Sequence, residues 1–378
     1  MLQRARQVFL GARAFSSSTR STDVVVLSEE VRSFVRRCMI AVGTRTDHAE
    51  SLAELLVVAD ERGHYSHGLN RLGMYVSDVF SKTTRTDTEP KIVKHTPATA
   101  FIDGRNALGP VVGKVCIDTA INKAKSVGVG WVACTNSNHY GIAGWYAIRA
   151  ADQGLIGMSF TNTSPLTVPT RSREAVLGTN PIAVAAPGKD GDHFVLDMAT
   201  STVSIGKVEV NLRKGMAIPS GWGVNSKGVE THKPQAVLSD GGLLPVGGTE
   251  ISGGYKGYGL ATMVEMFCGI LAGASYGPHV RKWMGDDDKI ANLGQCFVAV
   301  NPNMFASGFS DRLADLMTIL RNLPPADGET DVMVAGDPER QHLEKVKQLG
   351  GIPYHPAVIA ALDTLADEQQ VARIKSQN

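Results

Sequence analysis

The chain has 378 residues, of which 43% are hydrophobic and 20% are charged, so its composition is that of a folded globular protein. Its 38 Lys and Arg residues almost balance its 37 Asp and Glu residues, which argues against a nucleic-acid-binding protein. No apolar run approaches the roughly 18 residues that a membrane-spanning helix needs, and the 40 glycines indicate the tight turns of a ligand-binding α/β or α+β enzyme.

Residues 1–20 have a composition unlike the rest of the chain. They contain no acidic residue, a run of three serines and four arginines, Arg4, Arg6, Arg13 and Arg20. Such a segment is typical of a mitochondrial transit peptide, and a disordered basic tail is the alternative. We therefore expect a mitochondrial matrix protein that loses this segment, and we leave the segment out of the fold prediction.

Hydrophobic periodicity predicts three helices between residues 27 and 82. Ser28 is expected to cap the first helix. Asp47 and Glu50 form a capping pattern at the start of the second helix, which should end near Gly63. A polar loop then precedes the third helix.

From about residue 90 to residue 334, predicted strands and helices are mixed. The expected strands are 92–93, 100–102, 130–135, 156–162, 182–186, 194–197 and 297–300. The expected helices are 111–126, 141–153, 261–274 and 310–323. Residues 211–248 are rich in Gly, Pro and polar residues and predict a long excursion, and residues 341–367 return to a helical pattern.

The glycine motifs of the common nucleotide-binding folds are missing. No G-x-G-x-x-G follows a predicted strand, and no G-x-x-x-x-G-K-[ST] occurs. The glycine-rich segment 253–259 has a different spacing. A standard Rossmann domain and a P-loop protein are therefore disfavoured.

Two patterns could indicate a metal, and neither is complete. His64 and His67 have the spacing of a ligand pair, yet no nearby Cys or carboxylate completes a coordination set in the sequence. The five cysteines are widely spaced, and no C-x-x-C occurs. We therefore expect neither a metal nor a disulfide framework.

Two histidines in polar loops are candidates for acid–base chemistry. His67 follows Ser66 at a helix end, and Arg71, four residues further on, can hold a carboxylate through two parallel hydrogen bonds. His139 lies in a polar segment that follows a predicted strand, and Asp197 ends another strand, where it can orient a histidine. Ordinary solvated polar loops are the alternative for each segment.

Five segments occur in one order: residues 63–71, SNHYGIAG at 137–144, GTNPIAVAAP at 178–187, LDMATSTVSIGK at 196–207 and GYKGYGL at 254–260. In this combination the chain resembles the malate/L-lactate dehydrogenase family of the second, non-Rossmann type, whose members include ureidoglycolate and sulfolactate dehydrogenases. The resemblance implies an α/β fold with a mixed sheet. A helical domain built from both chain ends, 24–92 and 340–378, would join an NAD(P)-binding sheet domain, 93–339.

The resemblance also implies roles for particular residues. His67 matches a proton donor with Ser66 and Asp197 as relay partners, and His139 matches the proton acceptor of other members. The implied cofactor contacts are Asp197, Met198, Ala199, Gly247, Gly248, Gly336, Asp337 and Glu339. Residues 335–339, which contain the last three of these contacts, read Ala-Gly-Asp-Pro-Glu, where the family has Pro-Gly-Glu. The candidate substrate-binding residues are Arg71, Tyr75, Asn138, Thr163 and Lys256.

The chemistry fits these residue types, because a histidine with a reference pKa of about 6.5 can take the hydroxyl proton while hydride leaves for nicotinamide. We expect an oxidoreductase that uses NAD or NADP, with NAD favoured, on a small 2-hydroxy acid/2-oxo acid pair. Malate or lactate is the default substrate, and a homodimer is the expected assembly. Within the family, an imine or another 2-oxo acid is the alternative.

Two alternatives come from other classes of protein. One is a Ser66–His67–Asp197 hydrolase, which is disfavoured because adjacent Ser and His residues on one loop seldom point at each other. The other is a catalytically silent family member that only binds. The intact histidines argue against it.

Overall fold

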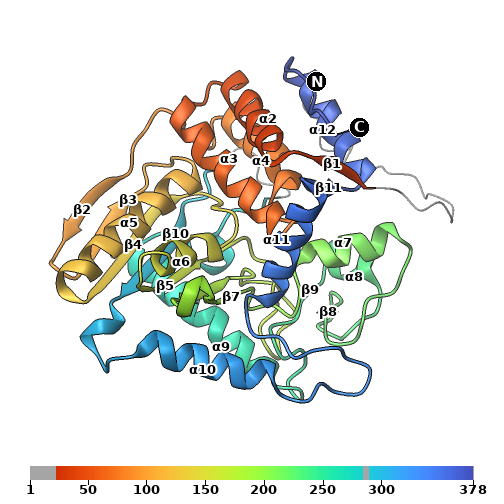
Figure 1. Cartoon of the computed structure of the whole chain (residues 1–378). Helices are drawn as coiled ribbons and strands as arrows, with labels where there is room; N and C mark the ends of the chain where they lie inside the picture. The colour runs from red at the N-terminus through yellow and green to blue at the C-terminus, as the bar shows by residue number, and fades with distance from the viewer. Residues whose placement is uncertain (1–22, 284–288, 378) are drawn as a thin grey trace.

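The computed structural model describes residues 23–283 and 289–377, so the expected transit peptide at 1–20 lies outside the described residues. Its largest sheet has the strand order β2-β3-β4-β10-β5-β6-β7 (Figure 1). These strands are β2 Lys91–His95, β3 Thr99–Asp103, β4 Val129–Ser137, β5 Ile156–Thr161, β6 Ile182–Ala186, β7 Phe194–Met198 and β10 Leu293–Val300. Only β3 and β4 run parallel. The mixed sheet confirms the expected α/β class, and it differs from the parallel sheet of a Rossmann domain.

The helices cover the sheet and form a separate layer beside it (Figure 1). They are α2 Ser28–Ala41, α3 Thr46–Glu61, α4 Leu72–Phe80, α5 Gly109–Val127, α6 Gly144–Ala151, α7 Ile205–Arg213, α8 Pro234–Ser239, α9 Gly254–Glu265, α10 Phe309–Arg321, α11 Asp337–Leu349 and α12 Pro356–Glu368. The short strands are β1 Val24–Val26, β8 Gly223–Val224, β9 Gly242–Leu243 and β11 Ile352–Tyr354. None of the described helices is both long and apolar enough to cross a membrane.

The sheet is buried on both faces at its centre, where alternate residues of the strand β10 enter different cores, and its edge strand β2 is exposed. Phe297 and Ala299 belong to the core formed with α5 and α6. Cys296 and Val298 belong to the core formed with α9 and the π-helical turn that continues it. Side chains of a strand point alternately to the two faces, so a strand covered on both faces reads as a continuous apolar run.

The first and last described elements of the chain meet in the helical layer (Figure 1). β1 pairs antiparallel with β11, so that Val24 lies opposite Tyr354. A single apolar core joins residues of α2, α3 and α4 to residues of α11, β11 and α12. Elements from both ends of the described chain therefore share one core, and the division into 24–92 with 340–378 and 93–339 stays a prediction. Near the expected edges, β2 begins at Lys91 and α11 begins at Asp337.

The expected excursion at 211–248 contains more structure than its composition indicates. It includes α8 and the β8–β9 pair, and together with α7 it has a small core of its own, Val208, Ile218, Val237 and Leu243. The helical pattern expected at 341–367 is interrupted by β11. Gly350 ends α11 with a φ of +71°, and Pro356 is the first residue of α12.

Two predicted helix caps are wrong. Ser28 is inside α2, and its hydroxyl donates to the Glu61 carboxylate at 2.7 Å. Asp47 is inside α3, where Arg45 holds its carboxylate. In both helices the residue at the cap position makes no side-chain cap hydrogen bond.

Two other helices have different starts from those expected. α6 begins at Gly144 and not at Gly141, because Gly141 has a φ of +76° and belongs to the loop that carries His139. α9 begins at Gly254, before the expected residue 261. A Cβ at Gly257 would lie 2.3 Å from the carbonyl oxygen of Val246, so glycine permits close packing there.

Candidate active site

The loop between α3 and α4 carries Ser66, His67 and Arg71. Gly63 ends α3 with a φ of +83°, a conformation that glycine adopts without strain. The His67 N–H then donates to the carbonyl oxygen of His64 at 2.8 Å. Arg71 Nε donates to the carbonyl oxygen of Ser66 at 2.7 Å, so the arginine returns to the loop that it follows.

Ser66 and His67 are in direct contact, because Ser66 Oγ lies 2.9 Å from His67 Nδ1. The expectation that adjacent Ser and His side chains seldom point at each other is therefore wrong for this tight loop. The other expected partner, Asp197, makes no hydrogen bond to His67 among the described residues. Asp197 Oδ2 instead accepts a hydrogen bond from the N–H of Gly144 at 2.7 Å. The structure therefore gives no direct support to the predicted relay from Asp197 to His67, and Asp197 anchors the start of α6.

His139 lies just after β4 and is held by Tyr75 of α4. The Tyr75 hydroxyl lies 2.6 Å from His139 Nδ1, and the N–H of Gly141 donates to the same nitrogen at 3.3 Å. The edge of the His139 ring also meets the Trp283 ring, with centroids 6.1 Å apart. Tyr75 was expected to bind substrate, but in the structure its hydroxyl fixes a histidine. No sequence pattern indicated this contact, because 64 residues separate the pair.

The two candidate histidines lie side by side. Their rings are nearly parallel, at 17°, with centroids 5.8 Å apart. Burial lowers the pKa of His67 to about 3, and the nearby charge of Arg71 adds to this effect. Burial also lowers the pKa of His139 well below its ordinary value, helped by His67 and Arg71. Both imidazoles are therefore neutral at pH 7, and their Nε2 atoms make no hydrogen bond to any described residue.

Arg71 is the cation of this cluster. Only its Nε makes a hydrogen bond among the described residues, so both terminal NH₂ groups are available to a ligand. Its charge acts on His67, His139 and Tyr75. An arginine with two free NH₂ groups beside two neutral histidines can bind a carboxylate and leave the histidines to act on the neighbouring carbon.

The remaining substrate candidates lie in less suitable positions. The NH₂ group of Asn138 donates to Asn106 Oδ1 at 3.0 Å and to the carbonyl oxygen of Ala107 at 2.8 Å. The Thr163 hydroxyl accepts from the N–H of Thr179 at 2.9 Å. Lys256 is exposed on α9, where its Nζ lies over the Tyr255 ring. No described contact joins Thr163 or Lys256 to the histidine pair.

The expected cofactor segments lie near one another. The N–H of Val246, next to Gly247 and Gly248, donates to the carbonyl oxygen of Thr200, next to Ala199, at 2.8 Å. Gly248 also lines a cavity of about 400 Å³ together with Arg173 and Lys227, whose cations suit phosphate groups.

In the third expected cofactor segment, which contains Gly336, Asp337 and Glu339, not every residue is free to contact a cofactor. Gly336 has a φ of +101° and begins α11. Burial raises the pKa of Asp337, but its hydrogen bonds to Arg321 and Arg340 prevail and hold that pKa below its usual range. Its carboxylate is therefore occupied, which argues against the expected cofactor contact. Glu339 Oε1 lies 3.6 Å from His64 Nε2 and so joins this segment to the catalytic loop.

The edge of the sheet at β7 fits a nicotinamide cofactor. β7 is the last strand, and the N–H of Val195 points off its outer edge to donate to Ala335 O at 3.1 Å. Because backbone groups alternate along an antiparallel strand, those of Asp197 point off the same edge. Asp197 also interacts electrostatically with His64 and Glu339. The outward backbone N–H and carbonyl of Asp197 on this edge can bind a carboxamide.

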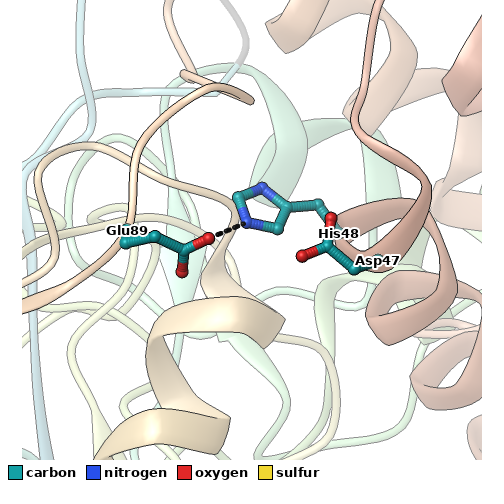
Figure 2. A group of neighbouring side chains, drawn as sticks. All are labelled: Asp47, His48 and Glu89. Carbon is teal, nitrogen blue, oxygen red and sulfur yellow. Dashed lines mark hydrogen bonds and ion pairs between the residues drawn. The ribbon is translucent and has the colours of Figure 1, made fainter.

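A third cluster, away from the histidine pair, has the composition of a metal site. Asp47, His48 and Glu89 bring three ligand atoms within 4.8 Å of one another, and His48 Nε2 lies 3.3 Å from Glu89 Oε1 (Figure 2). Arg45 already binds both carboxylates, with Nη1 2.6 Å from Glu89 and Nη2 2.5 Å from Asp47. The guanidinium supplies the positive charge that a metal would bring. The cluster is therefore explained as an ion network on the surface.

The segment Gly273–Gly277 has the spacing G-x-S-x-G of a hydrolase nucleophile turn. Ser275 Oγ, however, accepts from Asn292 Nδ2 at 3.4 Å, and no histidine contacts it among the described residues. Ser66 and His67 likewise lack the carboxylate of a triad. The structure gives no support to the hydrolase alternative.

The fold and the site together define a nicotinamide-dependent dehydrogenase with a pair of neutral histidines and an arginine for a carboxylate. The chain matches the model of the malate/L-lactate dehydrogenase family over residues 26–363. It is 41% identical over 346 residues to a malate dehydrogenase of Pyrococcus abyssi, covering 91% of this chain and 94% of that protein. It is 37% identical over 326 residues to an L-sulfolactate dehydrogenase of Methanocaldococcus jannaschii, covering 86% and 92%.

Solved structures agree with these sequence matches. The malate dehydrogenase of Pyrococcus horikoshii aligns with a TM-score of 0.85 and 36% identity, covering 95% of this chain and 99% of that one. The malate dehydrogenase of Entamoeba histolytica aligns with a TM-score of 0.87 and 29% identity, covering 93% and 99%. The chain belongs to the malate/L-lactate dehydrogenase family, and it is a 2-hydroxy acid dehydrogenase.

Proposed function

We propose that this dehydrogenase interconverts malate and oxaloacetate with NAD. The observation that carries the proposal is the stacked pair of His67 and His139 beside the two free NH₂ groups of Arg71. Malate is supported by the relative of that name at 41% identity. NAD is supported by a 34% identical relative named ureidoglycolate dehydrogenase (NAD(+)). Lactate is the alternative substrate.

The hydrogen bonds assign different protonation states to the two histidines. The N–H of Gly141 can only donate, so His139 Nδ1 must accept, and the proton of the neutral ring is on Nε2. His139 is therefore a hydrogen-bond donor toward a ligand. His67 Nδ1 faces a hydroxyl, which can donate or accept. His67 can therefore expose an unprotonated Nε2, and it is the better proton acceptor of the pair.

These states suggest how the residues divide the work. Arg71 binds the substrate carboxylate through its terminal NH₂ groups, and His139 Nε2–H donates to the hydroxyl oxygen. His67 Nε2 takes the hydroxyl proton, while its Nδ1–H donates to Ser66 Oγ. Bound NAD supplies the acceptor for the hydride, and the open edge of β7 with Asp197–Ala199 would hold it.

A substrate carboxylate bound to Arg71 also changes the pKa of His67. The positive charge of Arg71 lowers the pKa of His67. A carboxylate on Arg71 opposes that charge, so substrate binding raises the pKa of His67 toward the operating pH.

The test is a panel of acids assayed by the absorbance of reduced nicotinamide. Oxaloacetate, pyruvate, sulfopyruvate and a cyclic imino acid would each be offered with NADH and with NADPH. The proposal expects the highest kcat/KM for oxaloacetate with NADH. A higher kcat/KM for another acid, or for NADPH, would replace the corresponding part of the proposal.

We propose further that the enzyme is a homodimer that pairs through the outer face of α9. Apolar side chains are exposed on α9 and on the π-helical turn Met266–Ile270 that continues it: Tyr255 at 54%, Met266 at 48% and Ile270 at 54%. The opposite side of the same helix packs on the sheet. A helix with apolar residues on both sides needs a second surface to cover it.

We propose as well that residues 1–20 direct the protein to the mitochondrial matrix. The support is the composition, with four arginines and no acidic residue. Residues 1–30 fused to a fluorescent reporter should carry it to mitochondria. A diffuse cytosolic signal would reject this part of the proposal.

A further inference from the structure

Asp60, near the end of α3, is a buried carboxylate directly beneath the catalytic loop. Its side chain has no exposed surface. Its Oδ2 accepts two hydrogen bonds, from the N–H of Leu69 at 2.9 Å and from the Tyr354 hydroxyl at 2.7 Å. Leu69 is two residues after His67, and Tyr354 belongs to β11 near the other end of the chain. One oxygen atom therefore joins the catalytic loop to the C-terminal strand.

The same residue controls both ends of the loop. At the start, the carbonyl oxygen of Asp60 accepts from the N–H of Gly63 at 3.0 Å. At the end, Gly68 is pressed against the carboxylate, because a Cβ at Gly68 would lie 1.8 Å from Asp60 Oδ1. Gly68 directly follows His67. The position of the His67 backbone is therefore set by the Asp60 side chain.

The C-terminal segment supports the loop from the other side. The Tyr354 ring meets the Tyr65 ring edge to face, with centroids 5.9 Å apart. The Tyr65 hydroxyl in turn lies 3.2 Å from His342 Nε2 of α11. The loop is therefore held between α3 and the α11–β11 segment, and Asp60 makes hydrogen bonds to both the loop and β11.

Asp60 occupies this place at a cost to stability. Burial raises the pKa of Asp60 to about 7. No Lys or Arg among the described residues pairs with it. The titratable groups around it are Glu61 on its own helix, Tyr354 on β11 and Tyr65 on the loop, and none of them is a cation. A buried carboxyl without a cation contributes little to stability, so positioning is the better explanation for its contacts.

We propose that Asp60 is a positioning residue of the reaction, which acts by holding the Ser66–His67 loop against β11 through the Leu69 N–H and the Tyr354 hydroxyl. It touches neither substrate nor cofactor. The proposal rests on the assignment of His67 to the proton transfer. A displacement of about 1 Å at a reacting group can reduce the rate on the order of 100-fold, so a change in this support should be visible in kcat.

The experiment compares three variants with the full-length enzyme. Asp60→Ala removes the oxygen that accepts both hydrogen bonds, Tyr354→Phe removes one donor, and Asp60→Asn keeps an oxygen in the position of Oδ2. Val35→Ala, in the same apolar core on α2, is the control for a general loss of stability. The readouts are kcat for oxaloacetate reduction, KM for NADH, and hydrogen–deuterium exchange of the peptide that contains residues 64–70.

Asp60→Ala is expected to reduce kcat about tenfold or more and Tyr354→Phe about threefold, with KM for NADH within about twofold. Both should accelerate exchange at residues 64–70. Asp60→Asn should restore kcat to within about threefold of the wild type, because the acceptor matters and the charge does not. Val35→Ala should leave kcat and the exchange of this peptide unchanged.

Several outcomes would overturn the proposal. Asp60→Ala with a kcat within twofold of the wild type would do so, as would Val35→Ala with an equal loss. If Asp60→Asn has a kcat as low as that of Asp60→Ala, the charge of the Asp60 carboxylate is needed, and the hydrogen-bond acceptor alone is not sufficient. If Asp60→Ala does not fold, Tyr354→Phe decides, since unchanged kcat and exchange would contradict the proposal. If the wild type reduces no acid, the function fails, while exchange still tests Asp60.

Discussion

At the scale of single residues, Arg71 has two effects that act together. Its free NH₂ groups can bind a carboxylate, and its charge lowers the pKa of His67 and His139. Two adjacent imidazoles near a cation stay neutral, so one can accept a proton while the other donates a hydrogen bond. The site therefore needs no base besides the histidines. A substrate carboxylate on Arg71 would raise the pKa of His67.

Arg71→Lys tests the binding half of this account. Lysine keeps the charge but replaces two parallel hydrogen bonds with a single ammonium group. We expect kcat/KM for oxaloacetate to fall about tenfold or more, which corresponds to about 1.4 kcal/mol. Steady-state kinetics measure it, with Lys125→Arg on the exposed face of α5 as a control for basic substitutions. An unchanged kcat/KM in Arg71→Lys would remove this arginine from the site.

At the scale of elements, the helix and strand types followed from hydrophobic periodicity, but their ends did not. The continuous apolar run of β10 and the period of α10 were enough to predict both. Helix α9 starts seven residues before the predicted residue 261, and its added turns contain Gly257, which packs closely against Val246. Ser28 and Asp47 are residue types that commonly cap helices, but the Ser28 hydroxyl donates to Glu61 and the Asp47 carboxylate accepts from Arg45.

In the candidate site, too, local sequence patterns predicted some residues, whereas contacts between distant residues could not be predicted. Ser66, His67, Arg71 and His139 were identified because polar residues at element ends stand out in the sequence. Asp197 was placed beside His67 because a strand-end carboxylate commonly orients a histidine, but the N–H of Gly144 was the nearer partner. Tyr75 and Asp60 owe their roles to contacts across 64 and 294 residues. Local patterns carry no information about such distances.

The α3–loop–β11 junction predicts a pH-dependent stability. The pKa of Asp60 is about 7 in the folded protein and about 3.9 when unfolded, so the folded state binds more protons between these values. Ionisation of Asp60 therefore lowers the free energy of unfolding as pH rises from about 3.9 to about 7, by up to about 4 kcal/mol in total.

Asp60→Asn removes this ionisation and keeps the acceptor. Relative to the wild type, the variant should be more stable at pH 8 than at pH 5, by a few kcal/mol at most. Urea unfolding at the two pH values measures the difference, and Val35→Ala provides a control whose effect should not depend on pH. An Asp60→Asn effect of equal size at both pH values would contradict the assigned ionisation.

At the scale of the whole molecule, the sheet separates two surfaces of different character. The α5–α6 face is closed by its own core, and the α9 face keeps apolar residues outside that no described element covers. The helical layer, made from both ends of the chain, closes over the loop with His67. Pairing of two chains through α9 would leave this layer and its histidines untouched.

The dimer prediction is tested by a charge on the α9 face. Ile270→Asp, with 54% of the wild-type side chain exposed, should convert a particle of twice the chain mass into a monomer. Light scattering after gel filtration measures the mass, and Val127→Asp, at 47% exposure on α5, is the matched control. A wild type that is already monomeric, or a control that dissociates equally, would contradict the assigned interface.

The most direct test of the central claim compares His67→Asn with His139→Asn in pre-steady-state and steady-state kinetics. If His67 transfers the proton, His67→Asn should reduce kcat by about 10²–10⁴-fold and abolish the ionisation in the pH profile of kcat. His139→Asn, which loses a donor to the same oxygen, should reduce kcat less and keep that ionisation. Loss of the ionisation in His139→Asn and its persistence in His67→Asn would contradict the account and exchange the two roles.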